Sequence, residues 1–181
     1  MNRKKIMLLI IPAIIILIVS GCFCFFVLTH FCQTASPDQK HLTSYNLFNR
    51  VVTTKHTQTD TQTLELLSNC APWQSPRFSW SPNSRYLAIS YTDADHCRRI
   101  HMADFVDHKS FSVRENDLLS ACGRATPIEG CISLHFVEWL DNCHALIKFS
   151  WNNDKSSNTV SGWFTWQVAT GQILELHTGA A

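Results

Sequence analysis

The sequence contains none of the short motifs that mark the common classes of enzyme. A nucleophile elbow, the His-Glu pair of a zinc protease, a phosphate-binding loop and a dinucleotide fingerprint are all missing. The nine histidines are scattered, and two of them, His101 and His135, fall within strand patterns as ordinary strand residues. We therefore expect a protein that is not an enzyme and uses no cofactor. The alternative is an enzyme of an unrecognised class, which a compact acid/base cluster would reveal.

A basic stripe is also missing. Three of the 15 Lys and Arg residues precede a long apolar run, which leaves 12 basic residues against 14 acidic ones in the remainder of the chain. A protein that binds nucleic acid through its phosphates needs a surface rich in Lys and Arg. The sequence therefore predicts that nucleic acid is not a partner.

The chain has one long hydrophobic run, Ile6 to Leu28. As a helix its 23 residues would be about 34 Å long, against roughly 30 Å of bilayer hydrocarbon. The basic residues Arg3-Lys4-Lys5 before it favour a cytoplasmic N-terminus. The sequence thus predicts a cytoplasmic N-terminus (1–5), a transmembrane helix or uncleaved signal anchor (6–28), a linker (29–41) and an extracytoplasmic β-rich domain (42–181).

Two alternatives for this run stay open. Val19-Ser20-Gly21-Cys22 resembles the lipobox of bacterial lipoproteins, in which cleavage precedes lipidation of the cysteine, so Cys22 is a lipidation candidate. Ile6 to Val19 also has the length of the apolar core of a cleaved secretory signal. Against both, the apolar run continues through Phe23 to Leu28. All three interpretations place the domain outside the cytoplasm.

The rest of the chain reads as strands joined by turns. Arg77 to Tyr91 (RFSWSPNSRYLAISY) alternates apolar and polar residues on both sides of Pro82-Asn83-Ser84, which is typical of a half-buried hairpin. Gly171 is suited to a positive φ in a later turn. A single helical turn is expected at Asp117–Ser120. The other predicted strands are Tyr45–Thr53, Thr63–Leu67, Arg99–Phe105, Ser110–Val113, Leu134–Trp139, Ala145–Trp151, Trp163–Val168 and Gln172–Leu176.

The strand pattern repeats. Phe78-x-Trp80 opens one strand–turn–strand unit and Val137-x-Trp139 opens another, and the irregular stretch Glu115–Gly130 accounts for their wide separation. The count is two strands, then four, then four. The predicted fold is all-β, with antiparallel four-stranded sheets in an open stack or partial propeller behind the N-terminal helix. Association of chains into a closed ring, a homo-oligomer, stays open as an alternative.

Arg77–Tyr91 resembles the start of a WD40-like β-propeller repeat of the kind found in TolB-type periplasmic proteins. Phe164–Leu176 (FTWQVATGQILEL) resembles the closing two strands of such a repeat, and together the resemblance covers about residues 45–177. Two turns depart from it, because Asn83-Ser84 replaces Asp-Gly and Trp139-Leu140-Asp141 lacks Ser-Pro. The resemblance implies a binding platform and does not specify the partner.

Five of the eight cysteines fall in the predicted domain, where an oxidising compartment would favour bridges. Cys122 and Cys131 bracket the longest loop, so they are the favoured disulfide pair, with Cys70–Cys97 and Cys97–Cys143 as alternatives. The adjacent pairs His96-Cys97 and Cys143-His144 lack the spacing of structural zinc sites. We therefore expect no metal.

The aromatic residues Trp151, Trp163 and Trp166 are candidates for a binding face. Alternation places Phe164 and Trp166 on one side of their strand and Trp163 on the other, so one of the two sides must be core. The sequence as a whole predicts a membrane-anchored extracytoplasmic protein with a non-catalytic binding or scaffolding role. Its expected partners are the membrane, through the N-terminal segment, and an unidentified protein or envelope component.

Overall fold

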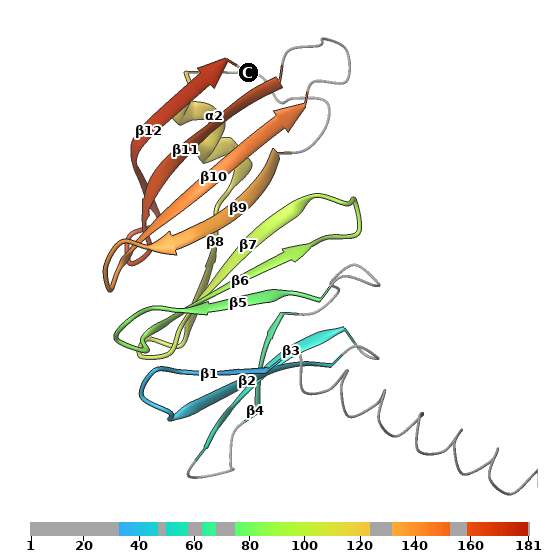
Figure 1. Ribbon diagram of the computed structural model, residues 1–181, viewed down its shortest axis with the longest axis vertical. Helices are drawn as coiled ribbons and strands as arrows, with labels where there is room; N and C mark the ends of the chain where they lie inside the picture. Colours follow the sequence, from blue (N-terminus) through green and yellow to red (C-terminus); the bar gives the residue numbers. More distant parts are fainter. Residues whose placement is uncertain are drawn as a thin grey trace, which may run out of the picture.

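In the part of the chain that the computed structural model describes, twelve strands form three four-stranded antiparallel sheets (Figure 1). The described residues are 33–46, 50–57, 63–67, 75–123, 132–152 and 159–180, and all structural statements below refer to them. The predicted membrane segment 6–28, with Cys22, lies outside these ranges. Within them, no helix combines the length and the hydropathy that a bilayer crossing requires.

Each sheet is built from consecutive strands, and each strand pairs with its neighbour in sequence. The N-terminal sheet contains β1 (Gln33–Ala35), β2 (His41–Asn46), β3 (Val51–His56) and β4 (Thr63–Leu67). The middle sheet contains β5 (Arg77–Trp80), β6 (Tyr86–Thr92), β7 (Arg98–Asp104) and β8 (Lys109–Ser112). The C-terminal sheet contains β9 (Ile132–Trp139), β10 (His144–Asn152), β11 (Thr159–Gln167) and β12 (Gln172–Ala180). The prediction of an all-β fold is confirmed for the described residues.

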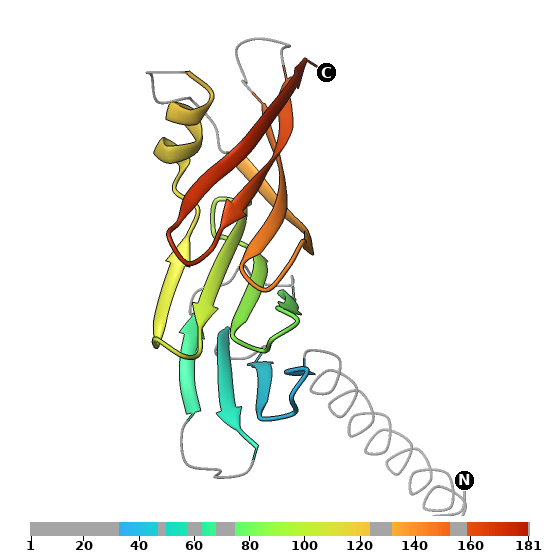
Figure 2. The same ribbon diagram turned by 90° about the vertical axis from the view of Figure 1, so that its left-hand side faces the viewer.

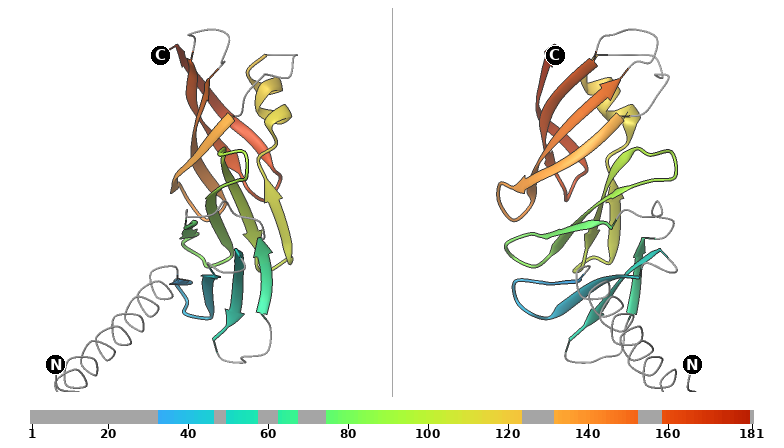
Figure 3. Two further views of the ribbon diagram at one scale, coloured as in Figure 1. Left: turned by 90° about the vertical axis from the view of Figure 1, so that its right-hand side faces the viewer. Right: turned by 45° about the vertical axis from the view of Figure 1, so that its right-hand side comes forward.

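The sheets stack face to face in one column, as Figures 1 and 3 show from three directions. The middle sheet lies between the other two, so both of its faces are covered. Along β6, Tyr86 and Ala88 pack into the core shared with the C-terminal sheet, whereas Leu87 and Ile89 pack into the core shared with the N-terminal sheet. This is why the strand reads as a nearly continuous apolar run instead of a strict alternation. The described sheets form an open stack with no ring closure.

The larger core joins the middle and C-terminal sheets. Ile147 on β10 pairs with Phe164 on β11, and both are fully buried. The helix α2 (Glu115–Ala121) adds Leu118 and Leu119 to the same core, beside the C-terminal sheet (Figure 2). The predicted helical turn at Asp117–Ser120 is therefore confirmed and is longer than expected.

The N-terminal sheet has four strands where the sequence pattern predicted two. Tyr45–Thr53 is not one strand but the end of β2 and the start of β3, and Arg50 between them has a left-handed φ of 57°. Gln33–Ala35, predicted as part of a linker, pairs with β2 and belongs to the sheet. A three-residue strand is too short to show a period of two, so its pattern gave no signal.

Two turns of the chain are copies of each other. In both Ser36–His41 and Ser81–Tyr86, the first serine donates its hydroxyl to the side-chain oxygen two residues later (2.6 and 2.8 Å) and accepts the N–H of the last residue (3.0 and 2.9 Å). Gln39 and Ser84 hold the same left-handed position, each with φ 61°. The copies also touch, because the Asp38 N–H donates to Ser84 Oγ at 3.0 Å. The N-terminal and middle sheets therefore share the same turn structure at corresponding positions.

Candidate anion-binding pocket

A pocket of about 300 Å³ opens between the middle and C-terminal sheets. Its walls come from the start of β5, the end of β6, the start of β7 and the middle of β9. The lining residues are Ser75, Arg77, Ser90, Tyr91, Thr92, Arg98, Leu134, His135 and Phe136. The volume lies at the lower end of the range of roughly 300–1,000 Å³ typical of ligand sites, so the pocket suits a small group or one end of a longer ligand.

The turn between β6 and β7 decides which arginine reaches the pocket. Asp93 accepts the N–H groups of Asp95 (3.0 Å) and Cys97 (2.9 Å) through Oδ1 and holds Arg99 Nε at 2.7 Å through Oδ2. Glu115 also pairs with Arg99. Because neighbouring strand residues point to opposite faces, the adjacent Arg98 is directed away from these carboxylates and toward β9.

The pocket carries uncompensated positive charge. Arg98 Nη1 lies 3.0 Å from His135 Nδ1, and Arg77 lies in the same lining. None of the nine lining residues is acidic, and no carboxylate of the described residues is within ion-pair distance of Arg77 or Arg98. The two guanidinium groups are therefore available to an anionic ligand.

The pKa of His135 is lowered in this environment. Burial lowers its pKa, and the nearby Arg98, Arg77 and Lys148 cations lower it further. The neutral ring can then accept a hydrogen bond from Arg98, which a protonated ring could not. An anion placed between these groups would satisfy both arginines, and Phe136 offers apolar surface for the rest of a ligand.

The predicted aromatic face is mostly core. Trp151 and Trp166 are 5% and 1% exposed and belong to the core beneath the C-terminal sheet, so they cannot form a binding surface. Both tryptophans lie on the face of their sheet that packs toward the middle sheet. Trp163 is on the opposite face, half-buried, and stacks on His177 with ring centroids 4.0 Å apart. The predicted alternation of Trp163 with Phe164 and Trp166 is confirmed.

The cysteine predictions are decided in part. Cys97 is disulfide-bonded and Cys143 is a free thiol, so the alternative Cys97–Cys143 bridge is wrong. Cys131 and Cys70 lie outside the described residues. Cys122 is not disulfide-bonded either, so the favoured Cys122–Cys131 bridge is wrong. The alternative Cys70–Cys97 bridge stays a prediction.

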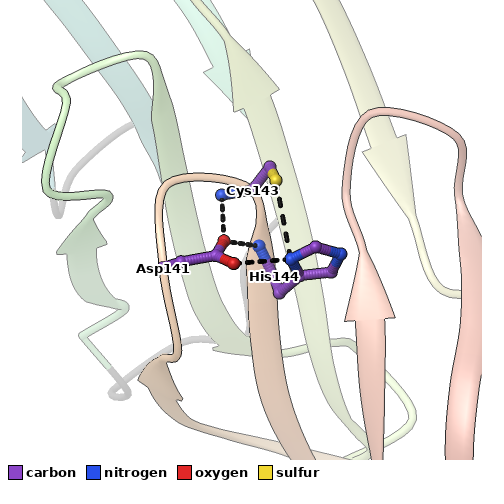
Figure 4. Close-up of side chains that lie close together, drawn as sticks. All are labelled: Asp141, Cys143 and His144. Atoms are coloured by element: carbon purple, nitrogen blue, oxygen red, sulfur yellow. Dashed lines mark hydrogen bonds and ion pairs between the residues drawn. The ribbon is translucent and has the colours of Figure 1, made fainter.

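One turn gathers side chains that could hold a metal. Between β9 and β10, ligand atoms of Asp141, Cys143 and His144 all lie within 4.8 Å of one another (Figure 4). The pKa of Asp141 lies below its ordinary value, chiefly because its carboxylate accepts the Cys143 N–H and also the His144 side chain and N–H. Burial and the neighbouring Asp141 raise the pKa of the Cys143 thiol. None of these three residues lines the pocket.

The sequence pattern did not identify Arg77, Arg98 and His135 as one site. They are far apart in the chain, and only the packing of β9 against the middle sheet unites them. The available signal was the pair Arg98-Arg99 after an acidic turn. One arginine balances the turn's carboxylate, which leaves the other on the opposite face without an acidic partner.

No protein-family model matches the chain, and no curated protein sequence is similar to it. Two solved structures, both β-propeller-like, resemble it in part. An acylaminoacyl peptidase of Pyrococcus horikoshii has 12% sequence identity and a TM-score of 0.43, over 77% of this chain and 23% of its own. A periplasmic gluconolactonase of Pseudomonas aeruginosa has 14% identity and a TM-score of 0.41, over 81% of this chain and 38% of its own. Likeness at this level carries no activity over to this chain.

Proposed function

We propose that this protein is a non-catalytic binding module that recognises a carboxylate-bearing segment of a partner protein in the pocket between its middle and C-terminal sheets. The observation that carries the proposal is the pair of arginines, Arg77 and Arg98, which line one pocket with no acidic partner among the residues that the structure describes. Arginine binds carboxylates through parallel hydrogen bonds, and such charge-assisted bonds are about twice as strong as neutral ones.

A peptide side chain suits the pocket better than a large free ligand. The volume of about 300 Å³ accommodates one or two side chains, while an open stack of sheets leaves the flanking surface accessible to the rest of a partner. Ser90 lines the same wall, and its hydroxyl can bond to peptide carbonyl or amide groups. This role agrees with the binding platform that the repeat pattern implies.

The module sits outside the cytoplasm behind a membrane anchor at Ile6–Leu28 in this proposal. The apolar run and its basic flank support the anchor. The disulfide at Cys97 supports an oxidising compartment. The duplicated turns Ser36–His41 and Ser81–Tyr86 support kinship with WD40-like propeller repeats at a finer level than the sheet arrangement alone.

The test is the affinity of full-length protein in non-ionic detergent for a fluorescein-labelled, glutamate-rich peptide, measured by fluorescence anisotropy. The same peptide with glutamine in place of glutamate is the control ligand. Binding is expected for the glutamate peptide alone and weakens as salt is added, because salt screens exposed charges. Arg98→Ala and Arg77→Ala each weaken it by roughly 10- to 100-fold, the value of a hydrogen bond to a charged group.

Lys109→Ala is the matched control, since Lys109 is an exposed cation on β8 outside the pocket. Its affinity should stay within about twofold of the unmodified protein, a change that corresponds to less than about 0.5 kcal/mol. Equal binding of the two peptides would overturn the proposal. So would equal losses in Lys109→Ala and Arg98→Ala, because general surface charge would then account for the binding.

A further inference from the structure

The turn between β9 and β10 places an oxygen, a sulfur and a nitrogen donor together at the surface. Asp141, Cys143 and His144 fall within four consecutive positions, with Asp141 exposed and the other two half-buried. The turn lies at the end of the strands opposite the pocket, near the start of β6, where Trp139 stacks on Tyr86. Its chemistry is therefore independent of the proposed binding function.

The separations of the donor atoms are close to those that a tetrahedral ion imposes. Zinc bonds of about 2.0–2.3 Å place neighbouring ligand atoms roughly 3.3–3.8 Å apart. Cys143 Sγ is 3.6 Å from His144 Nδ1, which already fits. Asp141 Oδ2 is 2.7 Å from the same nitrogen, a hydrogen-bond distance, so this pair must open by roughly half an ångström to admit an ion. Figure 4 shows the three side chains directed toward one another.

The backbone of the turn is arranged so that this small opening is easy. Asp141 Oδ1 accepts the N–H groups of Cys143 (2.7 Å) and His144 (2.8 Å), which fixes the position of the carboxylate. Oδ2 contacts the His144 ring nitrogen, and the Asp141 side chain is 53% exposed. An ion bound at Oδ2 would leave both backbone hydrogen bonds of Oδ1 in place. Hydrogen-bonded ligating carboxylates are typical of protein metal sites.

The turn is one residue shorter than its counterpart in the middle sheet, and this difference brings the donors together. The Val168 N–H bonds to the Cys143 carbonyl at 2.9 Å, just as the Phe105 N–H bonds to the Arg85 carbonyl at 2.9 Å. Cys143 thus takes the place that Arg85 holds in the middle repeat. There the arginine pairs with Asp104, whereas here a thiol faces an imidazole.

We propose that Asp141, Cys143 and His144 bind a Zn²⁺ ion at the tip of the β9–β10 turn, with the fourth position open to water or an external ligand. Thiolate and imidazole favour zinc over the hard cations Mg²⁺ and Ca²⁺, and Zn²⁺ accepts a carboxylate as third ligand. Sequence spacing gave no indication, because structural zinc sites combine two separated ligand pairs, whereas this site uses a single turn.

The test uses full-length protein in detergent, titrated with Co²⁺ as a spectroscopic probe and then with Zn²⁺. A sulfur-to-cobalt charge-transfer band in the near ultraviolet, saturating at one ion per chain, is expected. Zn²⁺ should abolish the band, because Zn²⁺ binds such ligand sets more tightly than Co²⁺. A saturating band that Zn²⁺ cannot displace would overturn the assignment to zinc, and the lack of a band would overturn the site.

Variants separate ligation from folding. Cys143→Ser should lose the band, and His144→Ala and Asp141→Asn should each weaken Co²⁺ binding at least tenfold. Asp141→Asn keeps an oxygen that can accept the two backbone N–H groups, so the turn itself is retained and circular dichroism should be unchanged. His108→Ala, which changes an exposed histidine outside the turn, should leave the titration unaltered. Unchanged Co²⁺ affinity in His144→Ala, or a band that persists in Cys143→Ser, would contradict the proposal.

Discussion

Gly162 offers the sharpest test of how the C-terminal sheet is packed. It lies in the middle of β11, paired with Phe149 on β10 and Thr178 on β12. A Cβ at this position would clash with the His177 carbonyl oxygen and would lie 2.8 and 2.9 Å from two atoms of the Phe149 ring. One obstacle is backbone and the other is a ring that is 3% exposed, so neither can move aside without disturbing the core.

Gly162→Ala should therefore lower the free energy of unfolding by about 2–3 kcal/mol, the upper part of the range for overpacked cores. With a urea m-value of about 1–3 kcal/mol/M, the unfolding midpoint falls by roughly 1 M. Gly179→Ala is the matched control, because its Cβ would meet nothing within 4 Å. That variant should change stability by less than about 0.5 kcal/mol.

The assay is urea denaturation of the detergent-solubilised chain, followed by tryptophan fluorescence. Trp166 is buried in the same core and reports its loss. If Gly162→Ala proves as stable as Gly179→Ala, Phe149 does not pack over β11 and the described core of the C-terminal sheet is wrong.

Two further predictions concern electrostatics and topology. Burial alone would raise the pKa of Asp104, but hydrogen bonds from Arg85 and from the Asp107 and Val106 N–H groups outweigh it, so the pKa is lowered. Its contribution to stability is thus present above the ordinary value of 3.8 and is lost as pH falls through the lowered pKa. Asp104→Asn should lower the free energy of unfolding by about 2–3 kcal/mol at neutral pH, less than the loss of a fully buried pair because the Arg85 side chain is 33% exposed. The variant should also lose less stability than the unmodified protein as the pH falls. An unchanged loss of stability in acid would contradict this reasoning. In spheroplasts, a membrane-impermeant maleimide should label Lys109→Cys at one site more than the unmodified protein and Asn2→Cys at no additional site, and the reverse pattern would refute the proposed orientation.

The middle sheet was the part of the fold that could be predicted best. Its hairpin Arg77–Tyr91 alternates apolar and polar residues in the first strand and has a Ser-Pro-Asn-Ser turn, and the bounds of β5 and β6 follow it closely. The expectation of a half-buried hairpin is wrong for β6, because both faces of this strand are covered. Gly171 was expected to have a positive φ, and its φ is 72°. Local signals of this kind come from steric limits on the backbone and from burial, which act within a few residues.

The four-stranded N-terminal sheet was not predicted, although the sequence of its first turn resembles that of the middle sheet. Ser36-Pro37-Asp38 has nearly the same residues, at the same spacing before the next strand, as Ser81-Pro82-Asn83. The polar composition of residues 33–40 favoured a linker instead, because β1 is too short to display a pattern. Its contacts are with residues far along the chain, such as the bond from Asp38 to Ser84.

The candidate sites could not be predicted from the sequence pattern, for a different reason. The pocket depends on which faces of β7 and β9 approach each other, and alternation alone gives two equivalent faces. The structure resolves that choice for Arg98 and His135, and equally for Trp151 and Trp166, which it places in the core. Composition could indicate the aromatic content but not the side on which it is exposed.

The most direct test of the binding proposal is the pKa of His135, measured by NMR with and without the glutamate-rich peptide. In the absence of peptide the pKa should lie below the ordinary value of 6.5, because of burial and the adjacent Arg98, Arg77 and Lys148 cations. A bound carboxylate favours the charged ring, so saturating peptide should raise the pKa, and affinity should increase as pH falls toward it. A pKa that is the same in the presence of bound peptide would show that the acidic group is held elsewhere and would contradict the account.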